Sequence, residues 1–124
     1  MGETYVEVKL RANDKEVTKK LLVDTGSIYS WINTETLQSL EVKPTDKYRF
    51  ETIEGRRVIR EISIVEVECL GRRAPTVVVF AKSRDSEVLG LHALEGLMLE
   101  VDPVRGELRK VTAIRAFKGI REAV

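Results

Sequence analysis

One acidic side chain stands out because of where the sequence places it. Asp24 follows a short apolar run, 21–23, and the tripeptide 25–27 separates it from a second apolar run, 28–32. Burying an ionised carboxylate costs free energy unless the group is hydrogen-bonded, paired with a charge or used in a reaction. The chemistry open to a carboxylate is proton transfer, as a general acid or a general base. The segment around Asp24 is therefore the first candidate for a functional site.

The composition limits the class of protein. The 124 residues suffice for one domain with its own core, and we expect a single domain over 1–124, with its core at about 4–114 and a tail at 115–124. Hydrophobic residues make up 43% and charged residues 33%, which is typical of a globular protein. The net charge of +1, from 21 basic and 20 acidic residues, gives no reason to expect nucleic acid or a membrane as a partner.

Cysteine use and the lack of apolar segments bear on location. Cys69 is the only cysteine, so an internal disulfide is impossible, and no cysteine and histidine residues have zinc-site spacing. We expect Cys69 to be a packed thiol in a strand. No apolar run approaches the roughly 18 residues of a spanning helix, and the first residues do not form a signal segment. The expectation is an intracellular, cytoplasmic protein.

Two hairpins are predicted around the candidate site. Residues 4–11 alternate between polar and apolar side chains, Asn13-Asp14 favours a turn, and 16–23 returns as a strand that ends at Asp24. A second alternating segment, 47–69, contains Glu54-Gly55, a pair that suits the tip of a tight hairpin. Because the arms of this second hairpin are strongly charged, we expect it to project into solvent.

The remaining elements are short. A helix at 35–40, capped by Asn33 or Thr34, would turn Leu37 and Leu40 inward, and Pro44 follows it. Further along we expect a turn at 70–75, a strand buried on both faces at 76–81 and a polar loop at 83–87. A strand end at 88–90 then leads into a helix at 91–95 that is closed by Gly96. The last predicted elements are two strands, 97–101 and 107–114, joined by a turn at 102–106. About six to eight strands with one or two short helices predict a mostly β domain, a closed or partly closed barrel.

Two motifs resemble those of a known family. Leu22-Val23-Asp24-Thr25-Gly26-Ser27 is similar to the catalytic motif of aspartic proteases, in which a strand delivers Asp into a Thr-Gly turn. Val88-Leu89-Gly90 resembles the second hallmark of that family, a strand end that packs under the catalytic loop and leads into a short helix. A glycine-tipped hairpin lies between them, where the family carries its flap. The order and spacing resemble the single-domain, retropepsin-like branch, over residues 4–114.

The resemblance implies a mechanism and roles for the motif residues. A water molecule would lie between two carboxylates, one ionised and one protonated, which titrate as a coupled pair. The resemblance implies that Asp24 is catalytic and that the Thr25 hydroxyl bonds to its twin in a second subunit. Gly26 lets the backbone approach water and substrate, and the Ser27 hydroxyl can donate to Asp24, favouring acidic pH for activity. No metal or cofactor is implied.

Counting carboxylates leads to a dimer. The other aspartates are Asp14, Asp46, Asp85 and Asp102, and none precedes Thr-Gly or Ser-Gly. A protease of this kind therefore requires a symmetric homodimer in which Asp24 faces its own copy. The alternatives are a non-catalytic retropepsin-like domain for dimerisation or peptide binding, and an unrelated β-barrel binding module.

The hairpin tip and the floor of the site would enclose the substrate. Ile53, Glu54 and Gly55 would form the flap, which closes over a peptide bound as an extended strand. Candidate pocket residues, each of which could equally belong to the core, are Ile28, Ile53, Val77 to Phe80 and Leu89.

Several residues depart from the family pattern or resist assignment. Leu91 stands where retroviral enzymes often carry an arginine that buttresses the dimer, and the tail after Ile114 does not match their terminal strand. The dimer interface would then use the tail or the loop after Ser30. His92, the only histidine, is interpreted as a surface or packing residue, and Trp31 as core or interface rather than a substrate platform.

Overall fold

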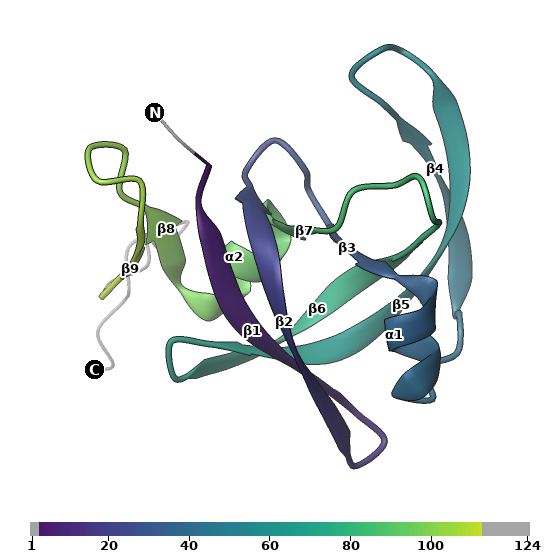
Figure 1. Cartoon of the computed structure of the whole chain (residues 1–124), viewed down its shortest axis with the longest axis horizontal. Helices are drawn as coiled ribbons and strands as arrows, with labels where there is room; N and C mark the ends of the chain where they lie inside the picture. The colour runs from purple at the N-terminus through teal and green to yellow at the C-terminus, as the bar shows by residue number, and fades with distance from the viewer. Residues whose placement is uncertain (1–2, 113–124) are drawn as a thin grey trace, which may run out of the picture.

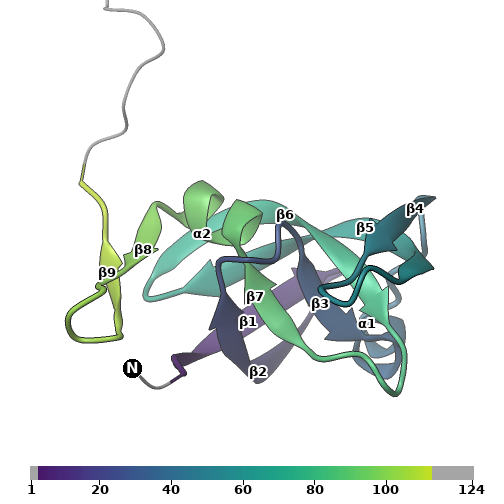
Figure 2. The same cartoon turned by 90° about the horizontal axis from the view of Figure 1, so that it is seen from above.

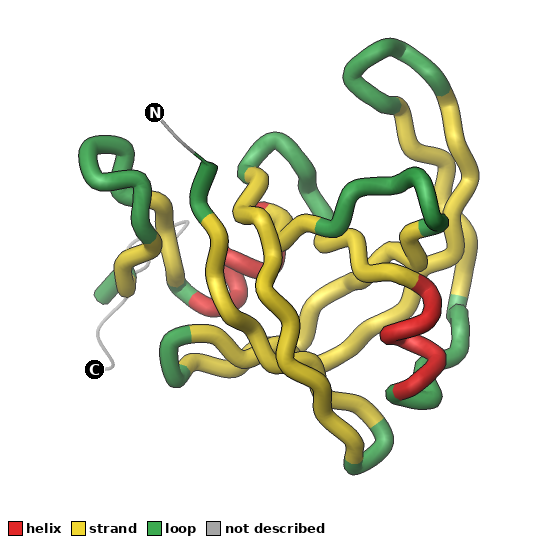
Figure 3. The backbone as a smooth tube through the Cα atoms, in the orientation of Figure 1, coloured by secondary structure: helices red, strands yellow, loops and turns green. Residues whose placement is uncertain are grey.

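Strands dominate the computed structural model of the chain, which describes residues 3–112 (Figures 1 and 3). These residues form nine strands and two helices. The strands are β1 Tyr5–Ala12, β2 Lys15–Asp24, β3 Ser30–Asn33, β4 Asp46–Glu51, β5 Arg57–Cys69, β6 Arg72–Ala81, β7 Val88–Gly90, β8 Leu99–Val101 and β9 Leu108–Lys110. The helices are α1 Thr34–Ser39 and α2 Leu91–Leu97.

Six of the strands close into a barrel, as the sequence predicted. The ring runs β1-β2-β7-β3-β6-β5 and is completed by pairing of β1 with β5, with Leu10 opposite Val67. Strand β4 extends the sheet beyond the ring by pairing with β5. Two pairs are parallel, β2 with β7 and β3 with β6, and each brings together segments distant in sequence. The first of these pairs carries the candidate site.

The two long hairpins form because their turns suit the twist of the strands. Asn13 and Asp14 have φ angles of 54° and 61°, and Leu70 and Gly71 have φ angles of 51° and 80°. Two successive residues with positive φ make the tight turn that antiparallel strands favour. The predicted turn at 70–75 was therefore too long, because Leu70 and Gly71 suffice and β6 already begins at Arg72.

Apolar side chains from the barrel strands and both helices fill the core. The largest fully buried ones include Leu10, Leu21, Ile32, Leu37, Leu40, Leu89, Leu94 and Leu97. The inward positions of Leu37 and Leu40 confirm the prediction for helix α1, whose N-cap Asn33 accepts a hydrogen bond from the Thr36 amide at 2.8 Å. Cys69 is buried as predicted, and burial raises the pKa of its thiol to about 11.

Helix α2 covers one end of the barrel and continues further than predicted. Gly96 does not close the helix but lies within it, and Met98 ends it with a φ of 54°. A Cβ atom at position 96 would lie 3.3 Å from the Cβ of Ala74, so the glycine allows α2 to pack closely on β6.

The two ends of the molecule carry different hairpins (Figures 1 and 2). The β4–β5 hairpin projects at one end, as predicted, and the small β8–β9 sheet lies at the other. Arg72 donates from Nη1 to the carbonyls of Met98 at 2.6 Å and Val111 at 2.9 Å, which ties the small sheet to the barrel.

The C-terminal strands are shorter than the predicted 97–101 and 107–114. Residues 97 and 98 belong to the end of α2, and β9 ends at Lys110. Ile114 and the tail 115–124 lie outside the described residues. Within 3–112, no helix is long and apolar enough to cross a bilayer.

Candidate active site

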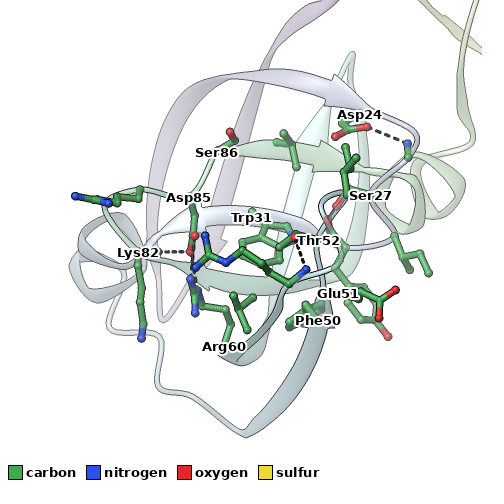
Figure 4. A pocket seen from close by; sticks show the side chains of 18 of the residues that line it. Asp24, Ser27, Trp31, Phe50, Glu51, Thr52, Arg60, Lys82, Asp85 and Ser86 are labelled. Atoms are coloured by element: carbon green, nitrogen blue, oxygen red, sulfur yellow. Dashed lines mark hydrogen bonds and ion pairs between the residues drawn. The ribbon is translucent and has the colours of Figure 1, made fainter.

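Asp24 is the last residue of β2, and its carboxylate is held by its own loop. The Gly26 amide donates to Asp24 Oδ1 at 2.9 Å, and the Ser27 amide donates to the Asp24 carbonyl at 3.2 Å (Figure 4). A Cβ at position 26 would lie 3.2 Å from the same Oδ1 atom. The bare Cα of Gly26 thus lets the backbone amide reach the carboxylate, which is partly buried at the edge of the barrel.

Gly90 lies directly under this loop. In the parallel pair β2–β7, Gly90 is the register partner of Asp24. A Cβ at position 90 would lie 2.4 Å from the Tyr29 carbonyl oxygen and 2.9 Å from that of Ser27. No other residue fits there without moving the loop. The Gly90 amide also donates to the Oγ of buried Ser30 at 2.9 Å.

The first turn of α2 holds the loop from the other side. The amides of Leu91 and His92 donate to the carbonyls of Ser27 at 2.8 Å and Ile28 at 2.9 Å. Amides in the first turn of a helix have no partner within the helix, so these bonds satisfy them. The junction of β7 and α2, which contains the Val88-Leu89-Gly90 motif, thus fixes the position and orientation of the loop that carries Asp24.

The expected bond from Ser27 to Asp24 is absent. Ser27 Oγ donates instead to the carbonyl of Tyr29 at 2.7 Å. A serine in a loop readily bonds to a backbone group two residues away, and its single proton is then used. Ser27 stabilises the loop and does not donate to the carboxylate.

Beside Asp24 the loop presents exposed side chains. Thr25 is exposed, and Ile28 and Leu91 are 67% and 36% exposed. Leu91, in the first turn of α2, is held against this loop by the bond from its amide to the Ser27 carbonyl. The site therefore borders an exposed apolar surface.

An open cleft of about 1070 Å³ extends from Asp24 (Figure 4). Its floor contains the Asp24 loop, Trp31 and Val88, one wall is the β4–β5 hairpin from Arg49 to Arg60, and the far end is the loop 82–86. Of the candidate pocket residues, Ile28 and Ile53 line the cleft. The other candidates do not line the cleft: Val78, Val79, Phe80 and Leu89 are at most 4% exposed and belong to the core, the alternative left open for them, and Val77 is partly buried.

Hydrogen bonds within the turn stabilise the hairpin tip beside the cleft. The Thr52 amide donates to the Arg56 carbonyl at 2.7 Å and the Gly55 amide to the Thr52 carbonyl at 2.9 Å. Gly55 has a φ of 84°, which glycine adopts without strain. Ile53 is fully exposed at 104%, and both Ile53 and Glu54 border the cleft. The tip is thus a formed turn with an apolar side chain free to contact a ligand.

Aromatic rings link the hairpin to the Asp24 loop. Trp31 and Phe50 lie 5.1 Å apart edge to face, and Tyr29 contacts both Phe50 and Tyr48. These ring contacts were not predicted from the sequence. Trp31 was expected in the core or an interface, whereas it is partly buried and lines the cleft.

His92 has the packing role that was expected. It is exposed, its ring lies edge-on to Tyr29 at 5.8 Å, and its Nδ1 lies 3.3 Å from Thr76 Oγ1. It does not line the cleft.

An ion pair at the far end of the cleft was also not predicted. Arg60, on β5, donates to Asp85 from Nε at 2.7 Å and from Nη2 at 3.0 Å. Their side chains are only 12% and 16% exposed. The hydrogen bonds from Arg60 hold the pKa of Asp85 below its usual value, and the Lys82 amide acts in the same direction. The sequence had placed Asp85 only within a polar loop, 83–87.

The described residues give no sign of a metal centre. Within 3–112 no group of three or more histidine, cysteine or acidic side chains could hold a metal ion. The other carboxylates of the cleft are Glu51 and Glu54 on the hairpin and Asp85, which Arg60 occupies.

Comparison with known proteins adds one finding. Residues 6–93, most of the chain, match a family model described as aspartyl protease. The match includes the Asp24 loop, the β4–β5 hairpin and the β7–α2 junction. No curated protein matches the chain.

Proposed function

We propose, since this chain belongs to the aspartyl protease family, that it is a retropepsin-like endopeptidase acting as a homodimer. Asp24 of each copy would supply half of the catalytic pair, and the whole chain would form one protease domain. The observation that carries the proposal is the position of Asp24, at a strand end on the floor of a cleft and on a loop fixed by Gly90.

The need for a second copy follows from the chemistry of the cleft. The reaction requires two carboxylates close enough to share a proton. Asp85 is bound to Arg60, and Glu51 and Glu54 lie on the hairpin wall rather than beside Asp24. A two-fold axis near the exposed Thr25 would bring in the missing carboxylate. The exposed Ile28 and Leu91 would then be covered by the partner, and Leu91 would replace the arginine buttress of retroviral enzymes with an apolar contact.

The proposed reaction uses a water molecule between the two Asp24 carboxylates. The ionised carboxylate takes a proton from the water as its oxygen attacks the peptide carbonyl carbon, and the protonated one donates to the carbonyl oxygen. The tetrahedral intermediate then collapses, and a proton passes to the leaving nitrogen. The bond from the Gly26 amide keeps one oxygen of Asp24 in place during these transfers.

The β4–β5 hairpin would act as the flap. Its tip, with Ile53, Glu54 and Gly55, would close over a peptide that lies extended between the flap and the cleft floor. The contacts of Phe50 with Trp31 and Tyr29 support this role, because they connect the base of the hairpin to the catalytic loop.

Peptide-library cleavage tests the proposal. Wild-type protein and the Asp24→Asn variant are incubated with a library across mildly acidic to neutral pH, and products are identified by mass spectrometry. We expect cleavage by the wild type alone, inhibition by a statine peptide, and a dimer in sedimentation. A dimer that binds peptide without cleaving it would favour the non-catalytic alternative, and a monomer at high concentration would contradict both.

A further inference from the structure

The far end of the cleft carries its own chemistry. Lys82, Ser83, Arg84 and Ser86, in the loop between β6 and β7, all line the cleft and are all exposed. Figure 4 shows Lys82 and the Arg60–Asp85 pair across Trp31 from Asp24. A peptide that extends along the cleft from Asp24 would pass these side chains.

The ion pair at this end leaves no free negative charge. Asp85 accepts two hydrogen bonds from Arg60 and one from the Lys82 amide at 2.8 Å. Both side chains are largely buried, so the pair is a fixed and neutral part of the wall. The charge of Lys82 also lowers the pKa of Asp85, but Arg60 supplies all the side-chain hydrogen bonds that Asp85 accepts.

The charges of the hairpin wall balance one another. Arg49 and Arg56 line the cleft together with Glu51 and Glu54, and all four are exposed. Two positive and two negative side chains on one wall give no net preference for the charge of a ligand.

Of the charged side chains that line the cleft, Asp24, Lys82 and Arg84 then remain, so the two cations outnumber the one carboxylate. Within residues 3–112, no carboxylate lies within 4.0 Å of either side chain. The neighbouring hydroxyls of Ser83 and Ser86 add donors suited to a carboxylate. Charged walls of a cleft concentrate ligands of opposite charge.

We propose that Lys82 and Arg84 make the cleft selective for acidic peptides. The acidic residues of such a peptide would not adjoin the cleaved bond but lie further along the chain from it. The inference rests on the proposed function and specifies its substrate class. In a two-fold dimer the basic loop occurs at both ends of the cleft, so acidic residues on either side of the bond would be recognised. The occupant is an extended peptide, because the apolar floor at Trp31 and Val88 suits side chains.

The test uses peptides with one fixed apolar pair and flanking positions that are all Glu, all Gln or all Lys. For the wild type we expect kcat/KM to fall about tenfold from the Glu to the Lys series, with Gln between them. Added salt should reduce the difference, since the side chains are exposed. Equal cleavage of the three series overturns the proposal.

Charge reversal assigns the effect to the loop. The double variant Lys82→Glu/Arg84→Glu should prefer the Lys series, while its melting curve stays that of the wild type. The matched control Lys43→Glu/Arg105→Glu makes the same charge change at exposed residues outside this cleft and should keep the preference for Glu. A preference for Glu that survives in the loop variant contradicts the inference.

A binding measurement keeps the two proposals separable. Fluorescence anisotropy with Asp24→Asn protein and the same labelled peptides needs no turnover. Tighter binding of the Glu series, lost in the loop variant, supports the selectivity even if no peptide is cleaved and the protease proposal fails. Equal binding of all series, with cleavage intact in the wild type, overturns the selectivity alone.

Discussion

Gly90 lies so close beneath Tyr29 that any Cβ at position 90 would sit 2.4 Å from the Tyr29 carbonyl oxygen. The same glycine pairs in register with Asp24 and donates its amide to Ser30. The position of the loop that carries Asp24 thus depends on the absence of one methyl group in the strand below it.

The Gly90→Ala variant tests this dependence. The backbone atoms around the new methyl cannot rotate away, so we expect the free energy of unfolding to fall by about 3 kcal/mol and peptide cleavage to be lost. Denaturant unfolding and a cleavage assay measure the two effects. Gly96→Ala is the control: its Cβ would lie 3.3 Å from the Ala74 Cβ and 3.9 Å from the Pro75 carbonyl oxygen, and we expect a change within about 1 kcal/mol. Equal stability of the two variants would contradict the steric argument.

Mixed dimers test whether two copies share one site. Asp24→Asn homodimers should lose activity about a thousandfold or more, with the melting temperature little changed. If both carboxylates are required, subunit exchange of equal amounts of wild type and variant leaves about a quarter of the activity of the same total amount of wild type. A residual activity near one half, measured after exchange is complete, would mean that each subunit works alone.

Acid should weaken the Arg60–Asp85 link. The native pKa of Asp85 is lowered by Arg60, so the ionised form stabilises the folded state. This contribution is fully present above the unfolded pKa of about 3.9 and is lost as pH falls through the native value. Asp85→Asn should lower stability by about 1–3 kcal/mol near neutral pH and flatten the acid limb of the stability curve.

The control for that variant is Asp46→Asn. Asp46 is exposed and its side chain accepts a hydrogen bond from the adjacent Lys47 amide. Its replacement should leave the acid limb unchanged. The unfolding free energies of wild type and Asp85→Asn are measured by urea titration over the acid range. If the two plots of free energy against pH run parallel, the acid dependence does not come from Asp85.

Replacing Phe50 tests the link between hairpin and loop. Phe50→Ala removes the contacts with Trp31 and Tyr29, and we expect kcat/KM to fall about two- to tenfold, mainly through KM. Ile59→Ala, on the same hairpin at a residue 55% exposed and outside the cleft, should have no effect. Steady-state kinetics on one peptide distinguishes these outcomes, and equal losses in both variants would argue against a specific role of the rings.

Local signals explain which parts of the fold were predictable. The alternation of 4–11, the turn at Asn13-Asp14 and the Asn33 cap are each encoded within a few residues, and all occur in the structure. Where two rules competed, the prediction failed. Pro75 suggested a longer turn, yet the preceding Leu70-Gly71 pair had already reversed the chain.

The site was predictable only where a motif marks it. The segment around Asp24 and the one ending at Gly90 could be found from their residue types, but their contact depends on the parallel pairing of β2 with β7. The Arg60–Asp85 pair and the Trp31–Phe50 contact join residues far apart in sequence, and neither has a spacing rule. The bond from the Ser27 hydroxyl to the Tyr29 carbonyl shows that a hydroxyl close to a carboxylate in sequence can donate to a different acceptor.

Closure of the six-stranded ring also bears on self-association. Since β1 pairs with β5, β4 is left at the edge of the large sheet, with no further strand beside it among residues 3–112. Exposed edges invite uncontrolled strand addition, and charged residues discourage it. Asp46, Lys47, Arg49 and Glu51 are all exposed along β4. The charged edge of β4 is thereby protected from becoming the seed of a fibril.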